Sequence, residues 1–407
     1  MMVDQSHNEK PRLWVVSELY YPEETSTGYY MTKIAEGLAD EAEVMAICSQ
    51  PTYSKRGTKA ARAEVHNGVE IFRVRSTTLD KDSIPLRLVN MLTFGAAVLW
   101  NGHRRFRPGD RVLVVTTPPL LPFAAMLAGV TRGCDVTLLI HDNYPEILLA
   151  AGKSAPDSLT VRLLNFANRW LYKNAARIIV VGRDMKSLVE RKAAGLDVPV
   201  HTIPNWAELE SVSPALREEN ALLSELALGD KFVFLYAGNM GWPNDLETIV
   251  DAAGELMGDP VHFIFLGAGA KRNWLERRVR EQKLTNITLL DPRPRAEQQE
   301  FLNACDVGIV SLVGKMKGVS MPSRTYNILA AGKPILAIAE AGSETALVVE
   351  ENEIGRFVEP GNVEAFVTAV RDFAAESPEL LSGRAGRARE IAERDYSLEK
   401  AVSEYRR

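Results

Sequence analysis

Short apolar runs alternate with longer segments of helical periodicity along the chain. Of all its sequence features, this alternation most strongly limits the folds that the chain can adopt. Strands of a parallel sheet read as nearly continuous hydrophobic runs, because helices cover both faces of such a sheet. Two series of runs occur, at 13–17, 44–48, 69–74, 111–116, 136–140 and 177–181, then at 232–236, 262–266, 287–290, 307–311 and 334–338. We therefore expect an α/β chain with two doubly wound parallel sheets.

The second series needs its own domain, since 407 residues exceed what one hydrophobic core usually serves. The segment 203–213, IPNWAELESVS, interrupts the pattern with proline, asparagine and serine. We expect a first domain over 1–203, a second over 204–395, and a helix over 396–407 that packs back on the first domain or caps the second. No low-complexity linker separates the domains, so we expect them to face each other across a cleft.

Cysteine usage and the N-terminal stretch both favour the cytoplasm. Cys48, Cys134 and Cys305 are far apart and odd in number, which supports neither a disulfide framework nor a bound metal. The first residues include acidic side chains and no long apolar core, unlike a secretory signal.

The net charge of -5 hides an asymmetry between the halves. Residues 1–203 hold 25 Lys+Arg against 21 Asp+Glu, which is +4, and the remainder holds 23 against 32, which is -9. A basic half argues for an anionic partner, but dispersed basic residues without regularly spaced aromatics make nucleic acid a poor candidate.

The apolar stretch 84–100 falls short of the roughly 20 residues that span a bilayer. It is followed by His103, Arg104, Arg105 and Arg107. We predict peripheral attachment to the anionic inner face of a membrane, with a buried helix that has a solvated basic end as the alternative.

The segment 315–340, KMKGVSMPSRTYNILAAGKPILAIAE, combines a cationic loop, a helix start and a buried strand. We expect Pro322 in the first helical turn, with Ser320 and Ser323 bonding to its amides and Gly332 ending the helix. Met321 falls within the same turn.

Such a helix start binds anions, and Lys315, Lys317 and Arg324 would add charge where a diphosphate could lie. An ordinary connection with solvated lysines is the alternative.

Ligands of open parallel sheets bind at the carboxyl ends of the strands, so residues that follow each strand are candidates. His141 and Asp142 follow 136–140, where an imidazole could donate a hydrogen bond to a substrate hydroxyl. A histidine satisfied by backbone, with Asp142 as a helix cap, is the alternative. In the polar loop after the first strand, Glu23, Thr27 and Gly28 could contact an acceptor or a phosphate.

The second series offers further loops of this kind. Glycines that allow close approach, neutral amides and a stiff proline turn follow its strands, at Gly238, Asn239, Gly241, Gly267, Gly269, Pro292 and Arg293. Arg272 stands where a third glycine would complete a dinucleotide fingerprint, which argues against an NAD site. The chain also lacks a Gly-x-Ser-x-Gly elbow, a Walker loop and a His-Glu-x-x-His pair.

Together these motifs resemble a known family over nearly the whole chain. YYPEETSTG, the strand-terminal HD, YAGNMG, FLGAG, PSRTYNILAAGKPILA and IGRFVEPGN are similar to family 4 glycosyltransferases of GT-B fold, most of all to the bacterial colanic-acid and O-antigen type.

The resemblance implies transfer of a sugar from a UDP- or GDP-sugar, with retention of configuration and neither metal nor other cofactor. It places the donor on the second domain, where Asn327 is one of the residues that would bind it. It places a lipid-linked or polysaccharide acceptor on the first domain. The implied process is polysaccharide or lipopolysaccharide assembly. It also implies that His141 reaches the sugar.

The chain departs from the wider family at several positions. Asn239 and Asn244 stand where the family has an arginine and a lysine, and Val319 and Asn327 stand where it has paired glutamates. Two alternatives therefore stay open, a non-catalytic nucleotide-sugar-binding partner of an assembly complex and a sugar-nucleotide epimerase of the same fold.

Overall fold

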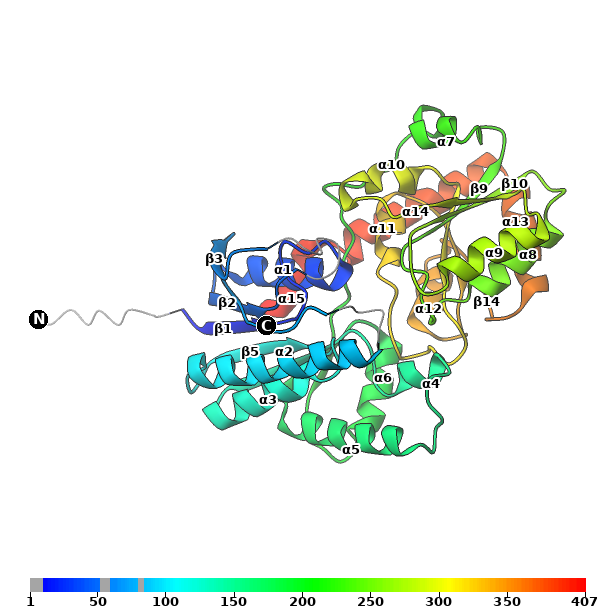
Figure 1. Cartoon of the computed structure of the whole chain (residues 1–407). Coiled ribbons are helices and arrows are strands. Elements are labelled where there is room, and N and C mark those ends of the chain that lie inside the picture. Colours follow the sequence, from blue (N-terminus) through cyan, green and yellow to red (C-terminus); the bar gives the residue numbers. More distant parts are fainter. Residues whose placement is uncertain (1–9, 52–58, 80–83) are drawn as a thin grey trace, which may run out of the picture.

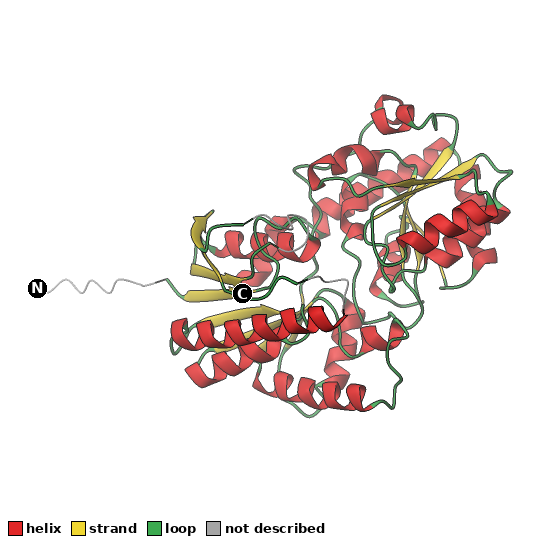
Figure 2. Ribbon diagram, viewed as in Figure 1, coloured by secondary structure: helices red, strands yellow, loops and turns green. Residues whose placement is uncertain are grey.

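The computed structural model describes residues 10–51, 59–79 and 84–407, which form two α/β domains (Figures 1 and 2). Residues 1–9, part of the stretch used to argue against a secretory signal, lie outside the described residues. The predicted fold class is confirmed, with one sheet in each domain.

The first sheet has eight strands, and all neighbours pair in parallel except its edge pair β3 and β4. In spatial order the strands are β3 (Ala63–His66), β4 (Val69–Arg73), β2 (Glu43–Cys48), β1 (Arg12–Val16), β5 (Arg111–Val115), β6 (Asp135–Ile140), β7 (Arg177–Val180) and β8 (Val200–Thr202). The sequence did not predict β3 and β8. Both are short edge strands with little buried surface, so neither carries an apolar run.

The second sheet has six parallel strands. Their order is β11 (Ile287–Leu290), β10 (Val261–Leu266), β9 (Phe232–Ala237), β12 (Val307–Ser311), β13 (Ile335–Ile338) and β14 (Gly355–Val358). Every residue of β10 is buried, as expected of a central strand covered on both faces. Edge strand β14 is mostly half-buried, and it too was not predicted.

Helices cover both sheets, and in Figure 1 α2 and α3 lie on the opposite side of the first sheet from α1 and α15. The first domain contains α1 (Ser26–Leu38), α2 (Ile84–Arg105), α3 (Leu121–Arg132), α4 (Glu146–Ala150), α5 (Leu159–Asn174) and α6 (Arg183–Lys192). The second contains α7 (Ala221–Glu225), α8 (Leu246–Glu255), α9 (Arg272–Gln282), α10 (Gln298–Asn303), α11 (Arg324–Ala330), α12 (Glu344–Glu351), α13 (Val363–Ala375) and α14 (Pro378–Asp395).

The last helix, α15 (Leu398–Arg406), returns to the first domain and packs on α1. The helices touch at Gly37, where an added Cβ would lie 2.5 Å from a methyl group of Val402. Arg406 also donates a hydrogen bond of 3.0 Å to the Gly37 carbonyl. The chain therefore joins the two domains both at 203–213 and at its C-terminal helices. Among the described helices, none combines the length and hydrophobicity that crossing a bilayer requires.

Candidate functional site

A cavity of about 1180 Å³ lies between the domains, where loops from the carboxyl ends of both sheets meet. Most of the predicted site residues line it, namely Thr27, His141, Asp142, Gly238, Asn239, Gly267, Gly269, Pro292, Arg293, Ser320, Met321, Pro322, Ser323, Arg324 and Asn327. A volume of this order accommodates a ligand larger than a single nucleotide base.

Four predicted residues are not among those that line the cavity. Glu23 is buried, and it fills the space beside Gly28, where a Cβ would lie 2.9 Å from the Glu23 carbonyl oxygen. Gly241 lies in the turn that leads to α8. Lys317 donates from Nζ to the Ala341 carbonyl at 2.9 Å, and neither residue lines the cavity. These four residues therefore lie outside the lining of the cavity.

The helix after the cationic loop begins later than predicted. α11 starts at Arg324, so Pro322 precedes the helix, and the side chain of Ser323 at the N-cap accepts no capping hydrogen bond. The hydroxyl of Ser323 instead lies 2.9 Å from that of Ser26 in the first domain. Ser320 pairs with Asp142 in an isolated β-bridge. Both serines therefore join the two domains across the cavity rather than cap the helix.

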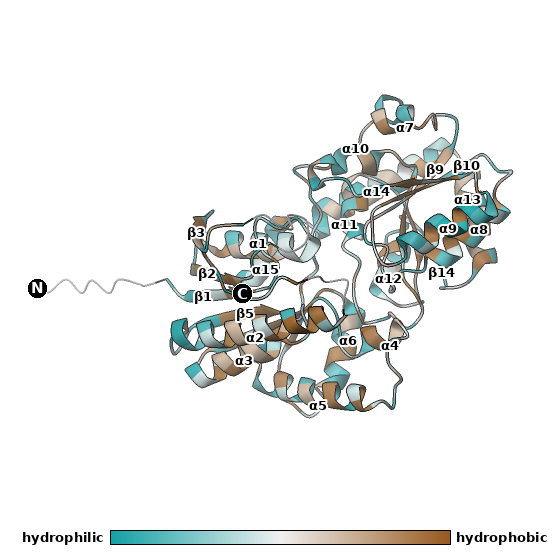
Figure 3. Cartoon of the chain, viewed as in Figure 1, coloured by the Kyte–Doolittle hydropathy of each residue, from teal (hydrophilic) through white to brown (hydrophobic). Residues whose placement is uncertain are grey.

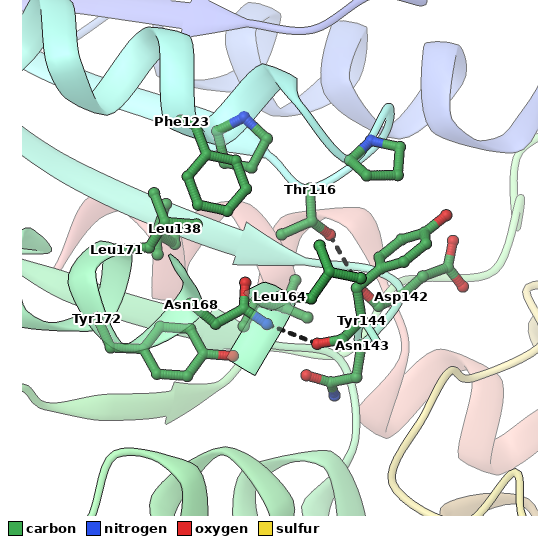
Figure 4. Close-up of a pocket in the computed structure, with 13 residues that line it drawn as sticks. Thr116, Phe123, Leu138, Asp142, Asn143, Tyr144, Leu164, Asn168, Leu171 and Tyr172 are labelled. Atoms are coloured by element: carbon green, nitrogen blue, oxygen red, sulfur yellow. Dashed lines mark hydrogen bonds between the residues drawn. The ribbon is translucent and has the colours of Figure 1, made fainter. Parts of the chain in front are cut away.

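The loop that carries His141 and Asp142 is fixed by the second domain. The Asn143 amide N–H donates to the Val319 carbonyl at 2.8 Å, and Asn143 Nδ2 donates to the Gly318 carbonyl at 2.7 Å. Asn168 on α5 donates to the Tyr144 carbonyl at 2.6 Å (Figure 4). The loop thus has little freedom relative to either domain.

Figure 4 shows a small, mostly apolar pocket behind this loop, with a volume of about 20 Å³. It shares Pro119, Asp142, Tyr144 and Leu164 with the cavity between the domains. A space of this size holds about one water molecule, so the large cavity is the candidate substrate site.

His141 is neutral at physiological pH, because burial lowers its pKa from 6.5 to about 4. Its Nε2 atom is buried and has no hydrogen-bond partner within the described residues. A buried nitrogen without a partner is costly, and a ligand hydroxyl in the cavity would satisfy it. Burial also raises the pKa of the neighbouring Asp142 to about 6.

Arg324 brings a positive charge to the other side of the cavity. Its guanidinium lies 4.1 Å from the centre of the Tyr236 ring, and Nη2 donates to the Asn239 carbonyl at 3.3 Å. Nη1 is buried and lacks a partner among the described residues. Gly238, at φ +137, leaves room for this side chain, because a Cβ there would lie 3.2 Å from Nη2. The guanidinium is therefore held in place with one nitrogen left for a ligand.

Asn239 and Asn244 shape the loop beneath Arg324. The Asn239 carbonyl accepts hydrogen bonds from the Tyr236 hydroxyl at 2.7 Å and from Asn244 Nδ2 at 3.0 Å. Lys271 donates to the Asn244 carbonyl at 2.7 Å, but it also pairs with Glu247 at 2.8 Å. The positive charge that reaches the cavity here therefore comes from Arg324.

Asn327 lines the cavity, but its amide is already engaged. Nδ2 donates to Glu208 Oε1 at 2.9 Å and to Gln298 Oε1 at 2.7 Å, while Oδ1 accepts from the Glu208 N–H at 3.2 Å. Asn327 therefore orders the segment between the domains, in addition to any contact with a donor. Glu208 was not predicted, because it belongs to no motif. Arg295 was not predicted either, although its place two residues after Arg293 could have indicated it.

Within the described residues, no group of three or more His, Cys, Asp or Glu side chains is arranged to hold a metal ion.

Comparison with known proteins identifies both domains. Residues 26–206 match the family model for the glycosyl transferase 4-like domain, and residues 231–376 match that for glycosyl transferases group 1. The chain is 30% identical to the probable glycosyltransferase WbjE of Pseudomonas aeruginosa, over 95% of this chain and 94% of the relative. It is 27% identical to the putative colanic acid biosynthesis glycosyl transferase WcaI of Escherichia coli K12, over 95% and 96%.

Solved structures agree with this fold. Sucrose-phosphate synthase from Thermosynechococcus elongatus superposes with a TM-score of 0.79 at 15% identity, covering 97% of each chain. Anabaena Alr3699/HepE, solved in complex with UDP, superposes with a TM-score of 0.72 at 13% identity, covering 97% of this chain and 98% of that one. At these identities the likeness extends to the fold alone.

Proposed function

The chain belongs to the GT-B glycosyltransferases of bacterial glycan biosynthesis, and from that premise we propose that it moves a sugar from a nucleotide-diphosphate donor to a lipid-linked glycan. The donor is a UDP- or GDP-sugar that lies mainly against the second domain. Transfer proceeds with retention of configuration and without a metal, in the cytoplasm at the inner face of the membrane.

One observation carries this proposal. His141 Nε2 from the first domain and Arg324 Nη1 from the second are both buried, both lack a partner within the described residues, and both belong to side chains that line the same cavity. A neutral imidazole suits a sugar hydroxyl, and a guanidinium suits a diphosphate. A nucleotide-sugar offers both groups in one molecule.

The same two residues suit the reaction. As the bond between the anomeric carbon and the phosphate oxygen breaks, the diphosphate gains negative charge and the sugar gains positive character. Arg324 stabilises the departing diphosphate, with the helix amides near Ser323 as weaker contributors because α11 is short. His141, being uncharged, holds the sugar without repelling the developing positive charge.

The acceptor approaches from the first domain. Thr27, Glu24 and Arg87 line that side of the cavity. An acceptor hydroxyl placed there forms the new glycosidic bond as the bond from the anomeric carbon to the phosphate oxygen breaks, and its proton passes to the departing diphosphate. The relatives named above support a glycan acceptor, since one of them is described as a colanic acid biosynthesis enzyme.

A panel of labelled UDP- and GDP-sugars tests this function. A donor raises the thermal midpoint of the protein because it binds the folded state. We expect one class of donor to bind and to undergo slow hydrolysis, and transfer with retained anomeric configuration once an acceptor is added. Epimerised donor would indicate an isomerase, and binding without any turnover would indicate a non-catalytic partner.

A further inference from the structure

Helices α2, α3 and α5 form a continuous layer on one side of the first sheet. α2 packs on α3, and α3 packs on α5 (Figure 1). The sequences of these three helices contain no Asp or Glu. They do contain basic residues, at Arg87, Arg104, Arg105, Arg132, Arg162, Arg169 and Lys173. An entire helical layer without acidic residues is unusual in a chain whose net charge is -5.

This layer also exposes large apolar side chains to solvent. Figure 3 shows hydrophobic segments, coloured brown, along α2, α3 and α5. Phe166 is 77% exposed and Leu163 is 58% exposed on α5, while Trp100 is 63% and Leu92 is 55% exposed on α2. Leu88, Val89, Leu127, Val130, Leu159 and Trp170 are exposed in the same three helices or at their ends. Single exposed apolar residues are common, but a cluster of this kind indicates a surface that binds a protein, a ligand or a membrane.

Arg132 and Arg169 donate to backbone carbonyls and Arg105 stacks on the Phe72 ring, whereas Arg104, Arg162 and Lys173 are available to a partner. Within the described residues, no ion pair involves a basic side chain of α2, α3 or α5. Arg104, Arg162 and Lys173 are exposed alongside the apolar side chains. A surface that exposes tryptophan and arginine together with leucine and phenylalanine is typical of proteins that contact the lipid headgroup region.

We propose that α2, α3 and α5 form the surface by which this protein binds an anionic lipid bilayer. The apolar side chains enter the headgroup boundary, and Arg104, Arg162 and Lys173 contact anionic headgroups. A second copy of the chain fits this surface poorly, because a twofold interface would place it against itself and bring like charges together. The inference deepens the proposed function, and it rests on that function only for the lipid-linked acceptor.

The same helices connect this surface to the cavity. Met91 on α2 and Leu164 on α5 line the cavity, while their chain neighbours Leu92 and Leu163 are exposed. An acceptor carried by a lipid would therefore reach the cavity along the first domain without leaving the membrane surface.

Vesicle flotation of the full chain, without substrates, tests the surface. We expect the protein to float with phosphatidylcholine vesicles that contain phosphatidylglycerol, and to stay behind with phosphatidylcholine alone. The double variant Arg104→Glu/Arg162→Glu should weaken binding at least about tenfold. Arg277→Glu/Arg280→Glu, on α9 of the second domain, makes the same change in net charge at exposed positions and should leave binding unchanged.

A second pair of variants tests the apolar contacts. Leu163→Gln/Phe166→Gln should weaken flotation several-fold, whereas Leu216→Gln/Leu380→Gln, at positions 65% and 61% exposed in the second domain, should not. Absence of flotation, or equal losses in test and control variants, would overturn the proposal. So would a concentration-dependent dimer that Leu163→Gln/Phe166→Gln abolishes, since the partner would then be a second copy. Donor hydrolysis in solution should be normal in all four variants. Absence of donor hydrolysis in the parent protein would count against the proposed function and not against this membrane-binding surface.

Discussion

The guanidinium of Arg295, in the second domain, lies 3.7 Å from the centre of the Tyr29 ring on α1 of the first domain. The same guanidinium donates from Nε to Glu208 Oε2 at 2.8 Å, and Glu208 belongs to the segment between the domains. Glu208 in turn accepts from Asn327 on α11. Three parts of the chain are thus held together at the edge of the cavity, so this cluster fixes how the domains face each other.

Removing Glu208 should loosen that arrangement. The carboxylate and the Arg295 guanidinium are both largely buried, and Glu208→Ala leaves the cation without its partner. We expect a loss of about 1–3 kcal/mol in stability, a lower Tm in calorimetry and faster proteolysis between the domains. Asp395→Ala removes partly exposed pairs with Arg394 and Lys400 and should cost less than about 1 kcal/mol. Equal effects of the two variants would show that the cluster does not join the domains.

His141→Ala should lower kcat by about 100-fold or more, because it removes a hydrogen bond to the reacting sugar. The donor Kd, measured by calorimetry, should change by less than about threefold, since the diphosphate contacts remain. His201→Ala, at an exposed position in the same domain, serves as the control and should keep full activity. Full activity of His141→Ala with the true acceptor would mean that the sugar lies elsewhere.

Arg324→Ala should raise the donor Kd by about 10- to 100-fold, the effect expected when charge-assisted hydrogen bonds to a diphosphate are lost. Arg324→Lys should recover part of the affinity, since an ammonium keeps the charge but not the paired geometry. Lys317→Ala is the matched control, because its ammonium donates to the Ala341 carbonyl outside the cavity. If Lys317→Ala weakened donor binding as much as Arg324→Ala, the assignment of the phosphate site would fail.

The pH dependence of stability should reveal His141 and Asp142 as opposing groups. Burial lowers the His141 pKa from 6.5 to about 4, so the unfolded chain binds more protons in that range and stability falls as the pH falls. Burial raises the Asp142 pKa from 3.8 to about 6, so the folded chain binds more protons there and stability rises as the pH falls.

Single substitutions separate the two contributions. Relative to the parent protein, His141→Asn should gain stability as the pH drops from 6.5 to 4, and Asp142→Asn should lose it as the pH drops from 6 to 4. Thermal midpoints across this range provide the measurement. Parallel curves for both variants and the parent would contradict the buried positions assigned to these side chains.

Much of the architecture could be predicted because the burial of a strand is reflected in the amino-acid composition of that short segment. Strands such as β9, β10 and β12 are nearly continuous apolar runs, since both their faces are covered. β3, β8 and β14 lie at sheet edges and have little buried surface, and their sequences include polar residues or glycine, so they carry no such signal; edge strand β11, ITLL, is mostly apolar and was predicted. Positions after strand ends were also predictable, because parallel strands bring their carboxyl ends to one edge. That rule brought His141, Gly238 and Gly267 to the cavity.

The sequence by itself therefore determined the two parallel sheets and most of the residues that could line a cleft between them. Only the tertiary structure decided which of those side chains remain available to a ligand. Lys317 and Arg324 are equally basic in the sequence, yet one is directed to the Ala341 carbonyl and the other leaves a buried nitrogen without a described partner. The physical reason is that a hydrogen bond depends on the positions of two groups in space, which their separation in the sequence does not reveal. Asn327, for example, donates a hydrogen bond to Glu208, which lies 119 residues away in the sequence.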